Sequence, residues 1–464
     1  MDRAGTLGEL IRSKYRVLSV KEEMRKNLLK SIQAGGELFP GIIGYQESVI
    51  PQVENAILSG HDLILLGERG QAKSRIARSM VQLLDEETPV IAGCEINDNP
   101  FSPICKSCRD KVEELGVDTE IAWISRDQRY GEKLATPDTT IADLIGEVDP
   151  IKVAEGRYLS DELTIHYGLV PRTNRGIFCL NELPDLAERI QVGLLNIMEE
   201  RDVQIRGYKV RLPLDLFVIA SANPEDYTNR GRIITPLKDR FGSQVRTHYP
   251  RNIAHEMAIM DQEQMAFADD GLETLVPSYM KEIVAEITHL ARKNNDISQR
   301  SGVSVRVSIC NYENLLSNAL KRAVRLGEKQ VCPRISDLHA VLASSMGKIE
   351  LESLGEARED KVLEKLVHGA VSAVFNRYLR VGDLDTIVAA FENALSVEAS
   401  DTMPSMDYVH QVAELPGLKE TLDKLQTQGA PAAVASGVEF ILEGMHLNRK
   451  LNKDRMAGHA RYRK

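Results

Sequence analysis

The chain has 464 residues, of which 43% are hydrophobic, and a formal net charge of −10 from 58 basic and 68 acidic residues. A chain of this length predicts about three domains with real cores. The negative balance disfavours a general nucleic-acid binder, because such proteins neutralise phosphates with an excess of Lys and Arg. Since no run of about 20 apolar residues and no signal-peptide core is present, we expect a cytoplasmic protein without a membrane span.

The first residues predict helices that precede the first core. Residues 1–38 are charged and amphipathic and lead into the turn sequence AGGELFPG. Glycine and proline clustered in this way interrupt regular structure. We therefore expect an N-terminal helical segment over residues 1–38.

The most informative stretch is LILLGERGQAKS at residues 63–74. Its apolar run predicts a buried strand, and the loop that follows ends in Lys73 and Ser74. Backbone N–H groups of such a loop and the N-terminus of the next helix bind phosphate oxygens. In the pattern G-x-x-x-x-G-K-[ST], the lysine contacts the β- and γ-phosphates and the hydroxyl binds Mg²⁺. The alternative is a polar turn before the helix.

The whole loop is a candidate for binding a nucleotide: Gly67, Glu68, Arg69, Gly70, Gln71, Ala72, Lys73 and Ser74. Ala72 stands where the pattern has its second glycine. Either the loop tolerates the methyl group in the glycine conformation, or the backbone at this position keeps a negative φ.

Residues 93–137 are longer than a crossover between strands requires, and they contain Cys94, Cys105 and Cys108. Cys105 and Cys108 have the spacing of half a zinc site. A closed structural site needs four ligands, and no second pair follows nearby. We therefore expect no zinc here and six reduced cysteines in the whole chain.

Two further strand patterns end in polar residues. GIFCLNELPD, at residues 176–185, places Asn181 and Glu182 after an apolar run, and residues 216–220 lead to Asn223. In P-loop enzymes an acid at this strand end helps to hold Mg²⁺, and a neighbouring Glu polarises the attacking water. Asn181 can hydrogen-bond a water of Mg²⁺ but brings no negative charge to the metal. An Asn before Pro is also an ordinary turn signal. The prediction of a nucleotide site therefore depends on the order of these motifs and not on Asn223 alone.

Two basic segments need separate interpretations. Residues 200–213, ERDVQIRGYKVRLP, alternate like a hairpin and include Arg206, Lys209 and Arg211. They form either a solvated charged hairpin or a functional one. The basic tail at residues 449–464 predicts a mobile solvated segment rather than a docking arm.

In their order along the chain, these motifs resemble the AAA+ ATPases of the helix-2-insert group, most closely the ATPase subunit of magnesium chelatase and the MoxR-type ATPases. The similarity spans residues 39–346 and includes GIIGYQESV, HYGLVPRTNRGIFCLNELPDL, ASANPEDY, TPLKDRFG and SVRVSI. It implies an α/β P-loop core at 39–250, made of a parallel sheet with flanking helices. A helical lid at 251–348 and a mostly helical region with the basic tail at 349–464 follow.

The resemblance also implies roles for single residues. Ile43 and Gly44 would begin the adenine pocket, Asn223 would be the sensor-1 residue, and Arg240 would be an arginine finger offered to a neighbouring subunit. Arg306, or else Arg300, would be the lid sensor. Arg240 could instead be a helix-terminal salt-bridge residue. Residues 148–168, including Arg157, would form the helix-2 insert rather than a plain loop, and the hairpin at 200–213 would face the ring channel.

We therefore expect a slow ATPase that uses ATP and Mg²⁺, with Lys73 and Glu182 central to its chemistry. It would form a homo-oligomeric, hexameric ring that remodels a partner protein or loads metal into it. No metal-adhesion motif is present in the sequence, so a von Willebrand factor A domain would come from another protein. Ala72 and Asn181 favour an alternative, an ATP-dependent scaffold that hydrolyses little. A nucleic-acid translocase is a third, less favoured, possibility.

Overall fold

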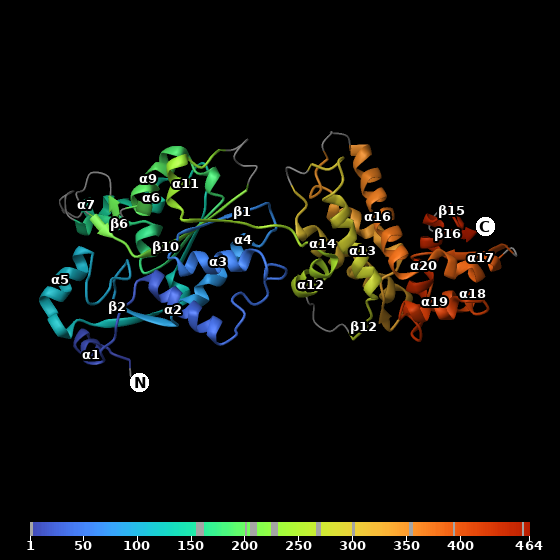
Figure 1. Cartoon of the computed structure of the whole chain (residues 1–464), viewed down its shortest axis with the longest axis horizontal. Helices are drawn as coiled ribbons and strands as arrows, with labels where there is room; N and C mark the ends of the chain where they lie inside the picture. Colours follow the sequence, from blue (N-terminus) through green and yellow to red (C-terminus); the bar gives the residue numbers. More distant parts are fainter. Residues whose placement is uncertain are drawn as a thin grey trace. The chain divides into compact units, whose positions relative to one another are not determined.

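The computed structural model describes ten stretches of the chain: residues 3–154, 162–199, 202–204, 211–223, 231–265, 271–298, 302–351, 356–392, 395–456 and 459–464. It divides into two compact units, Met1–His248 and Tyr249–Lys464 (Figure 1). Within the described residues, no helix has the length and apolarity needed to cross a membrane.

The first unit is built on a five-stranded parallel sheet with the order β11-β1-β10-β7-β4 (Figure 1). Its strands are β1 (Leu63–Leu66), β4 (Tyr130–Leu134), β7 (Gly176–Asn181), β10 (Leu216–Ala222) and β11 (Ser243–Arg246). β7 and β10 are buried along their whole length. Apolar runs of this kind are typical of parallel strands covered on both faces. The predicted α/β fold class is therefore correct.

Successive side chains of the central strands serve two different cores, because strand side chains alternate between faces. Ile177, Phe217 and Ile219 pack with α2 (Val20–Gln33), α3 (Val49–Leu58) and α4 (Lys73–Ser79). Phe178 and Val218 pack on the other face with α9 (Glu188–Glu199) and α11 (Thr235–Arg240). Other short helices of this unit include α1 (Leu7–Arg12), η1 (Met80–Leu83), α6 (Ile141–Leu144), α8 (Leu169–Arg172) and η5 (Leu183–Asp185).

The N-terminal helices are part of this first unit. α2 begins at a capping box formed by Ser19 and Glu22 and contacts β10. Glu23 of α2 accepts two hydrogen bonds from the buried Arg129, at 2.7 and 2.6 Å. Removing either partner of a buried pair of this kind would destabilise the fold, because the other charge would be left uncompensated.

The predicted insertion at 93–137 contains a helix and part of a separate antiparallel pair. β2 (Glu87–Ile91) pairs with β3 (Ile121–Ser125). Between them lie α5 (Lys106–Leu115) and η2 (Gly116–Asp118), and η3 (Arg126–Arg129) then leads into β4.

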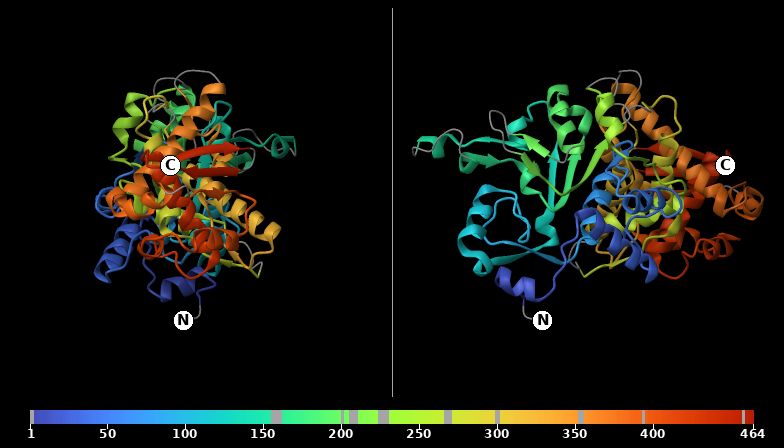
Figure 2. Two further views of the ribbon diagram at one scale, coloured as in Figure 1. Left: turned by 90° about the vertical axis from the view of Figure 1, so that its right-hand side faces the viewer. Right: turned by 60° about the vertical axis from the view of Figure 1, so that its left-hand side comes forward.

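Two small antiparallel pairs extend from the same unit (Figure 2). β5 (Gly146–Val148) pairs with β6 (Ile165–Tyr167), and α7 (Pro150–Ala154) and η4 (Glu162–Thr164) lie between them. β8 (Asp202–Gln204) pairs with β9 (Arg211–Pro213), so the strand pairing predicted for residues 200–213 is confirmed. Arg157 of the predicted insert, and Arg206 and Lys209 at the hairpin turn, lie outside the described residues.

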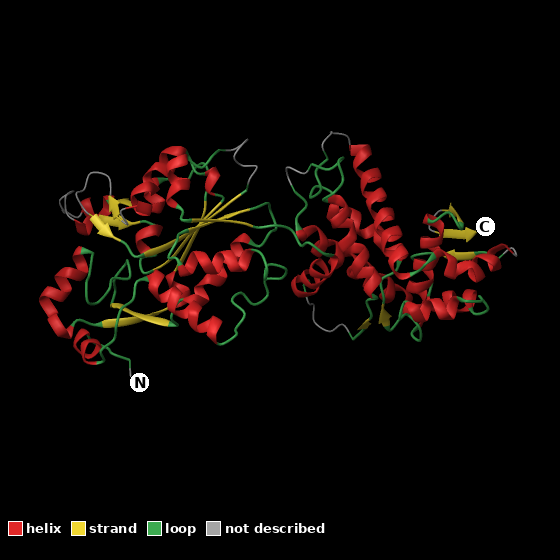
Figure 3. Cartoon of the chain, viewed as in Figure 1, coloured by secondary structure: helices red, strands yellow, loops and turns green. Residues whose placement is uncertain are grey.

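The second unit is mostly helical (Figure 3). Its longest helices are α12 (Ile253–Glu263), α13 (Ser278–Ala291), α14 (Val305–Leu326), α16 (Glu356–Tyr378) and α20 (Pro431–Leu447). Shorter elements complete it: β12 (Glu273–Thr274), β13 (Gln330–Val331), η6 (Ile335–Ala340), α15 (Val341–Ser345), η7 (Val381–Leu384), α17 (Asp385–Glu392), α18 (Ser405–Val412) and α19 (Leu418–Lys424). The sequence of α20 is mostly apolar. In the structure this helix is buried on nearly all of its sides and not on one face only.

The prediction of a mobile basic tail is wrong. β15 (Asn452–Met456) and β16 (His459–Arg463) form a three-stranded antiparallel sheet with β14 (Val397–Ala399). Tyr462 is buried and donates a hydrogen bond to Glu443, and Lys453 contacts the same carboxylate at 2.7 Å. Lys453, Arg461 and Lys464 of the tail thus form ion pairs with acidic side chains elsewhere in this unit.

Candidate nucleotide-binding site

The loop between β1 and α4 is held in shape by its own side chains. Gln71 is buried, and its Oε1 accepts hydrogen bonds from the backbone of Glu68 at 3.1 Å and from Thr247 at 2.7 Å. A Cβ at Gly67 would overlap the side chains of Thr247 and Gln71. Only glycine fits at this position. Arg69 is exposed beside Gly70, which has a φ of 75°.

Ala72 adopts the left-handed conformation, with φ 56° and ψ 16°, at the N-cap of α4. The alternative of a negative φ is therefore wrong, and the loop carries its methyl group in the conformation of the missing glycine. Such a conformation costs a non-glycine residue about 1–3 kcal/mol. Strain at this position is compensated by the contacts around it, including the hydrogen bonds of Lys73.

Lys73 is buried and points its ammonium back into the loop. Nζ donates to the carbonyl oxygens of Gly67 and Glu68, the latter at 2.9 Å, and to Oδ1 of Asn223 at 2.8 Å. Asn223 follows the end of β10 and in turn donates from Nδ2 to Oε2 of Glu182 at 3.2 Å. Lys73, Asn223 and Glu182 are thus linked at the carboxyl ends of neighbouring parallel strands, where ligands of α/β proteins bind.

Ser74 and Asn181 also approach each other, with 3.5 Å between the serine hydroxyl and Oδ1 of the amide. The same Oδ1 accepts a hydrogen bond from Ser221 at 3.1 Å, and Nδ2 donates to Oε1 of Glu132 at 2.5 Å. These partners orient the amide so that its oxygen faces Ser74. Oxygen ligands of this kind suit Mg²⁺, which is commonly bound through a few protein groups and several waters.

Glu132, on β4, is a residue of this site that sequence reasoning missed. Arg78 binds its carboxylate through two hydrogen bonds, at 2.8 and 3.0 Å. Burial acts to raise the pKa of Glu132, but the hydrogen bonds and charge of Arg78 outweigh it and hold the pKa below its usual value. A negative charge therefore does lie beside Asn181, already paired with a cation. No motif marks Glu132 in the sequence, because it enters the site only by strand pairing with β7.

Glu182 lies directly after β7 in a left-handed conformation, with φ 54° and ψ 48°. Its backbone N–H donates to Ser221 at 3.2 Å. Its side chain makes no capping hydrogen bond to η5. Non-glycine residues in this conformation are concentrated at functional sites. Ser221 links Asn181 to Glu182 and is the second residue that sequence reasoning did not select.

Arg240 ends α11 and forms an ion pair with Glu199 of α9. Nε lies 3.0 Å from the carboxylate, and Nη1 donates to the carbonyl of Pro236 at 2.9 Å. In the single chain the side chain therefore makes the helix-terminal salt bridge proposed as its alternative role. Its action toward a neighbouring subunit stays a prediction.

Ile43 and Gly44 precede Tyr45, which joins this segment to the loop. The Tyr45 hydroxyl lies within hydrogen-bond distance of the carbonyl oxygens of Gln71, at 3.0 Å, and His248, at 2.7 Å, and can donate its one proton to either. Burial raises the pKa of Tyr45 to about 12, so the hydroxyl remains a neutral donor. Gly44 has a φ of 82°. These contacts place the predicted start of the adenine pocket beside the phosphate loop.

The predicted lid sensors belong to the second unit. Arg306 is exposed in the first turn of α14, where its backbone N–H is capped by Ser304. Arg300 lies outside the described residues. The choice between these two arginines stays open.

The sequence of the chain is similar to those of several known proteins. Residues 155–240 match the profile of the Sigma-54 interaction domain family. The chain is 30% identical over 256 residues to the chloroplastic magnesium-chelatase subunit ChlI-2 of Arabidopsis thaliana, a match covering 53% of this chain and 56% of the relative. It is 24% identical over 362 residues to subunit ChlI of Nephroselmis olivacea, covering 71% and 94%. The chain thus spans about half the length of the Arabidopsis relative.

Similar solved structures were also found. NtrX from Brucella abortus has a TM-score of 0.41 at 15% identity, covering 79% of this chain and 69% of its own. A complex between subunits BchI and BchD of magnesium chelatase gives a TM-score of 0.34 at 17% identity, covering 75% and 97%.

The parallel sheet with this strand order, the glycine-containing loop after β1 and the polar residues that end β7 and β10 resemble the arrangement of AAA+ ATPases, and the sequence matches agree with that resemblance. The chain is similar in sequence to subunit ChlI of magnesium chelatase, which agrees with the resemblance predicted from its motifs.

Proposed function

We propose that this chain binds Mg·ATP at the loop of residues 67–74 and hydrolyses it slowly as a ring-forming motor. The observation that carries the proposal is the hydrogen-bonded chain from Lys73 through Asn223 to Glu182. It joins the three side chains that a P-loop mechanism needs, one for phosphate charge, one for sensing and one for water.

The residues present fit a magnesium nucleotide. The Lys73 ammonium is held by loop carbonyls that phosphate oxygens can replace. Ser74 and Asn181 would hold Mg²⁺, the latter through water. Bound there, the metal would neutralise charge that develops on the phosphates. Lys73 would bind the β/γ-phosphates, and Glu182 would orient and deprotonate the attacking water.

Arg240 is proposed to act on the nucleotide of a neighbouring subunit in a homo-oligomeric, hexameric ring. To do so its guanidinium must exchange Glu199 for phosphate oxygens, which form equally good bidentate contacts with arginine. Differential contacts with ATP and ADP could then drive a conformational change. The related chains are named as subunits of magnesium chelatase. We therefore propose a protein client, remodelled or loaded with metal.

The test is ATP turnover by the purified full chain, with and without DNA. Phosphate release that requires Mg²⁺, is lost in Lys73→Ala and does not respond to DNA supports the motor. Stimulation by DNA would support a nucleic-acid translocase instead, which the net charge of −10 disfavours.

An ATP-dependent scaffold is the second candidate. The observation that favours it is the pairing of Glu132 with Arg78, which leaves Asn181 without a free negative charge for the metal. A scaffold would assemble on ATP without measurable phosphate release. Sedimentation with and without ATP, run beside the turnover assay, separates the two.

A further inference from the structure

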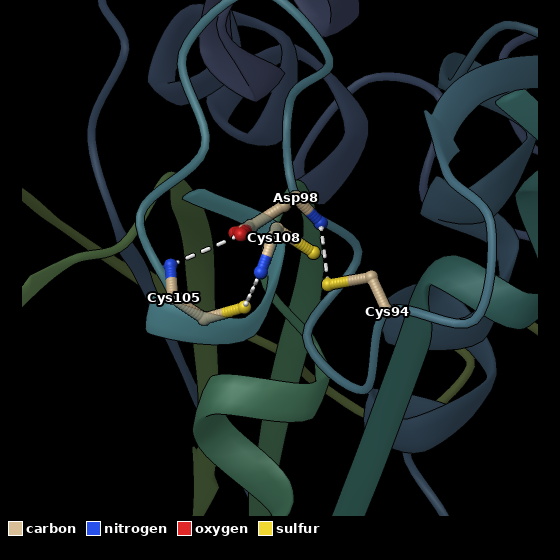
Figure 4. A group of neighbouring side chains, drawn as sticks. All are labelled: Cys94, Asp98, Cys105 and Cys108. Atoms are coloured by element: carbon tan, nitrogen blue, oxygen red, sulfur yellow. Dashed lines mark hydrogen bonds between the residues drawn. The ribbon is translucent and has the colours of Figure 1, made fainter. Parts of the chain in front are cut away.

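Three cysteines and one aspartate converge in the insertion between β2 and β3. Cys94, Asp98, Cys105 and Cys108 each offer one ligand atom, and these atoms all lie within 4.8 Å of one another (Figure 4). The Cys105–Cys108 pair therefore has two further candidate ligands close to it in space, although no second pair follows it in the sequence. The missing ligands precede the pair in the sequence instead of following it.

The distances suit a small tetrahedral ion. Zn–S bonds of about 2.3 Å place sulfur atoms of a tetrahedral site roughly 3.8 Å apart, so a slight contraction of this cluster would close it around zinc. Asp98, Cys105 and Cys108 are buried, and Cys94 is partly exposed, which leaves a path for the ion to enter.

Backbone groups already support the ligand atoms as they do in metal sites. The Cys94 sulfur accepts from the N–H groups of Ile96 at 3.4 Å and Asp98 at 3.3 Å, and the Cys105 sulfur accepts from Cys108 at 3.4 Å. Cys105 is the N-cap of α5, so the helix dipole also favours thiolates at this end. Such outer contacts orient ligands and tune their basicity.

Asp98 distinguishes this cluster from a patch of buried core cysteines. Its Oδ2 accepts from the N–H groups of Ile104 at 3.2 Å and Cys105 at 3.0 Å. Its Oδ1 is buried and has no hydrogen-bond partner among the described residues. A buried carboxylate oxygen without a partner is costly, whereas a bound cation would satisfy it.

We propose that Cys94, Asp98, Cys105 and Cys108 form a structural zinc site that ties the loop after β2 to the start of α5. Three thiolates select a soft ion, and a closed set of four protein ligands is typical of structural zinc. The site is separate from the proposed nucleotide site and needs no nucleotide.

The test is the metal content of the full untagged chain, grown with zinc and purified under reducing conditions without chelators. We expect close to one zinc per chain, and loss of most of it in Cys105→Ser and in Cys108→Ser. Cys332→Ser is the matched control, because Cys332 is a buried cysteine of the second unit, and it should keep its zinc.

Asp98 provides a test that does not depend on removing a thiol. Asp98→Asn preserves the acceptor for two backbone N–H groups but should release zinc at least tenfold faster to a chelator. Asp98→Cys should retain zinc, and after replacement with Co²⁺ it should show stronger thiolate-to-metal absorption than wild type. Zinc at background level in wild type, equal zinc in wild type and the cysteine variants, or a Cys105–Cys108 disulfide in the reduced preparation would each overturn the proposal.

Discussion

Lys73 and Asn223, separated by 150 positions in the sequence, are joined by a 2.8 Å hydrogen bond from Nζ to Oδ1. Because Asn223 also donates to Glu182, the lysine of the phosphate loop and the acid at the end of β7 share one hydrogen-bonded chain. A substitution at either end changes the surroundings of the other. Each variant below should therefore be compared with wild type in thermal stability as well as in activity.

Lys73→Ala should weaken nucleotide binding strongly. Loss of a charge-assisted contact to phosphate costs about 1.5–3 kcal/mol, which corresponds to a decrease in affinity of roughly 10- to 150-fold. Calorimetric titration with ATP measures this. Lys348→Ala, at an exposed position of the second unit, is the control and should bind normally. Undiminished affinity of Lys73→Ala would sink the phosphate-loop assignment.

Ala72→Gly should stabilise the nucleotide-free chain. The left-handed backbone at Ala72 is strained for alanine and not for glycine, and its release should add about 1 kcal/mol to the free energy of unfolding of the first unit. Ala34→Gly is the matched control, since Ala34 is exposed at a negative φ of −77° and should gain nothing. Urea unfolding of both variants and of wild type measures these free energies. A free energy of unfolding for Ala72→Gly that is equal to or lower than that of wild type would contradict the strain argument.

Glu182→Gln should bind ATP but lose turnover by about 10²- to 10⁴-fold, the usual contribution of a general base. The amide can still accept the hydrogen bond of Asn223, so the fold should be unaffected. Phosphate release and nucleotide binding are measured on the same preparation. Glu188→Gln, at an exposed position of α9, is the control. Normal turnover of Glu182→Gln would remove Glu182 from the proposed chemistry.

Asn181→Asp should behave differently from what the sequence alone suggests. Restored charge near Mg²⁺ predicts equal or higher turnover. In the structure, however, the new carboxylate would lie against Glu132, 2.5 Å from the amide nitrogen it replaces. Like charges at this distance raise the pKa of the pair and destabilise the fold. We expect a lower melting temperature at neutral pH.

The pH dependence and a second substitution test this explanation. Because the folded-state pKa is raised, the destabilisation should be absent below the unfolded value of about 4 and complete above the folded value. Glu132→Gln combined with Asn181→Asp removes the repulsion and should restore stability. If the double variant melts no higher than Asn181→Asp, the contact with Glu132 is not the cause.

Arg240→Ala and Lys73→Ala should each lack activity alone and regain some when mixed. With random mixing, on the order of a quarter of the interfaces would combine an intact phosphate loop with an intact arginine, which can be worth roughly 10³-fold or more in turnover. Pull-down of one tagged variant must first show co-assembly.

Glu199→Gln separates this role from a structural one. If Arg240 acts only through its ion pair, Glu199→Gln should reproduce the defect of Arg240→Ala. If Arg240 is an arginine finger, Glu199→Gln should remain active because it frees the guanidinium. Mixed rings that show no ATP turnover at any ratio of the Arg240→Ala and Lys73→Ala variants would favour the structural role.

The sequence alone determined the fold class and the order of the nucleotide motifs. Buried strands such as β7 and β10 have continuous apolar runs because both faces of a parallel sheet are covered, and such runs are visible without a structure. The phosphate loop is likewise local, since its residues are consecutive. The antiparallel strands β8 and β9 were predictable for the same reason.

Tertiary structure decided everything that depends on residues distant in the chain. Glu132 lies beside Asn181 because β4 pairs with β7, and Asp98 accepts a hydrogen bond from the backbone of Cys105 because of the conformation of the loop between them. No sequence spacing predicts either contact. The basic tail became strands because Glu443 and Glu398 lie opposite its lysine and arginine side chains. The positive φ of Ala72 also emerged only in three dimensions, because surrounding contacts can impose a backbone conformation that alanine itself disfavours.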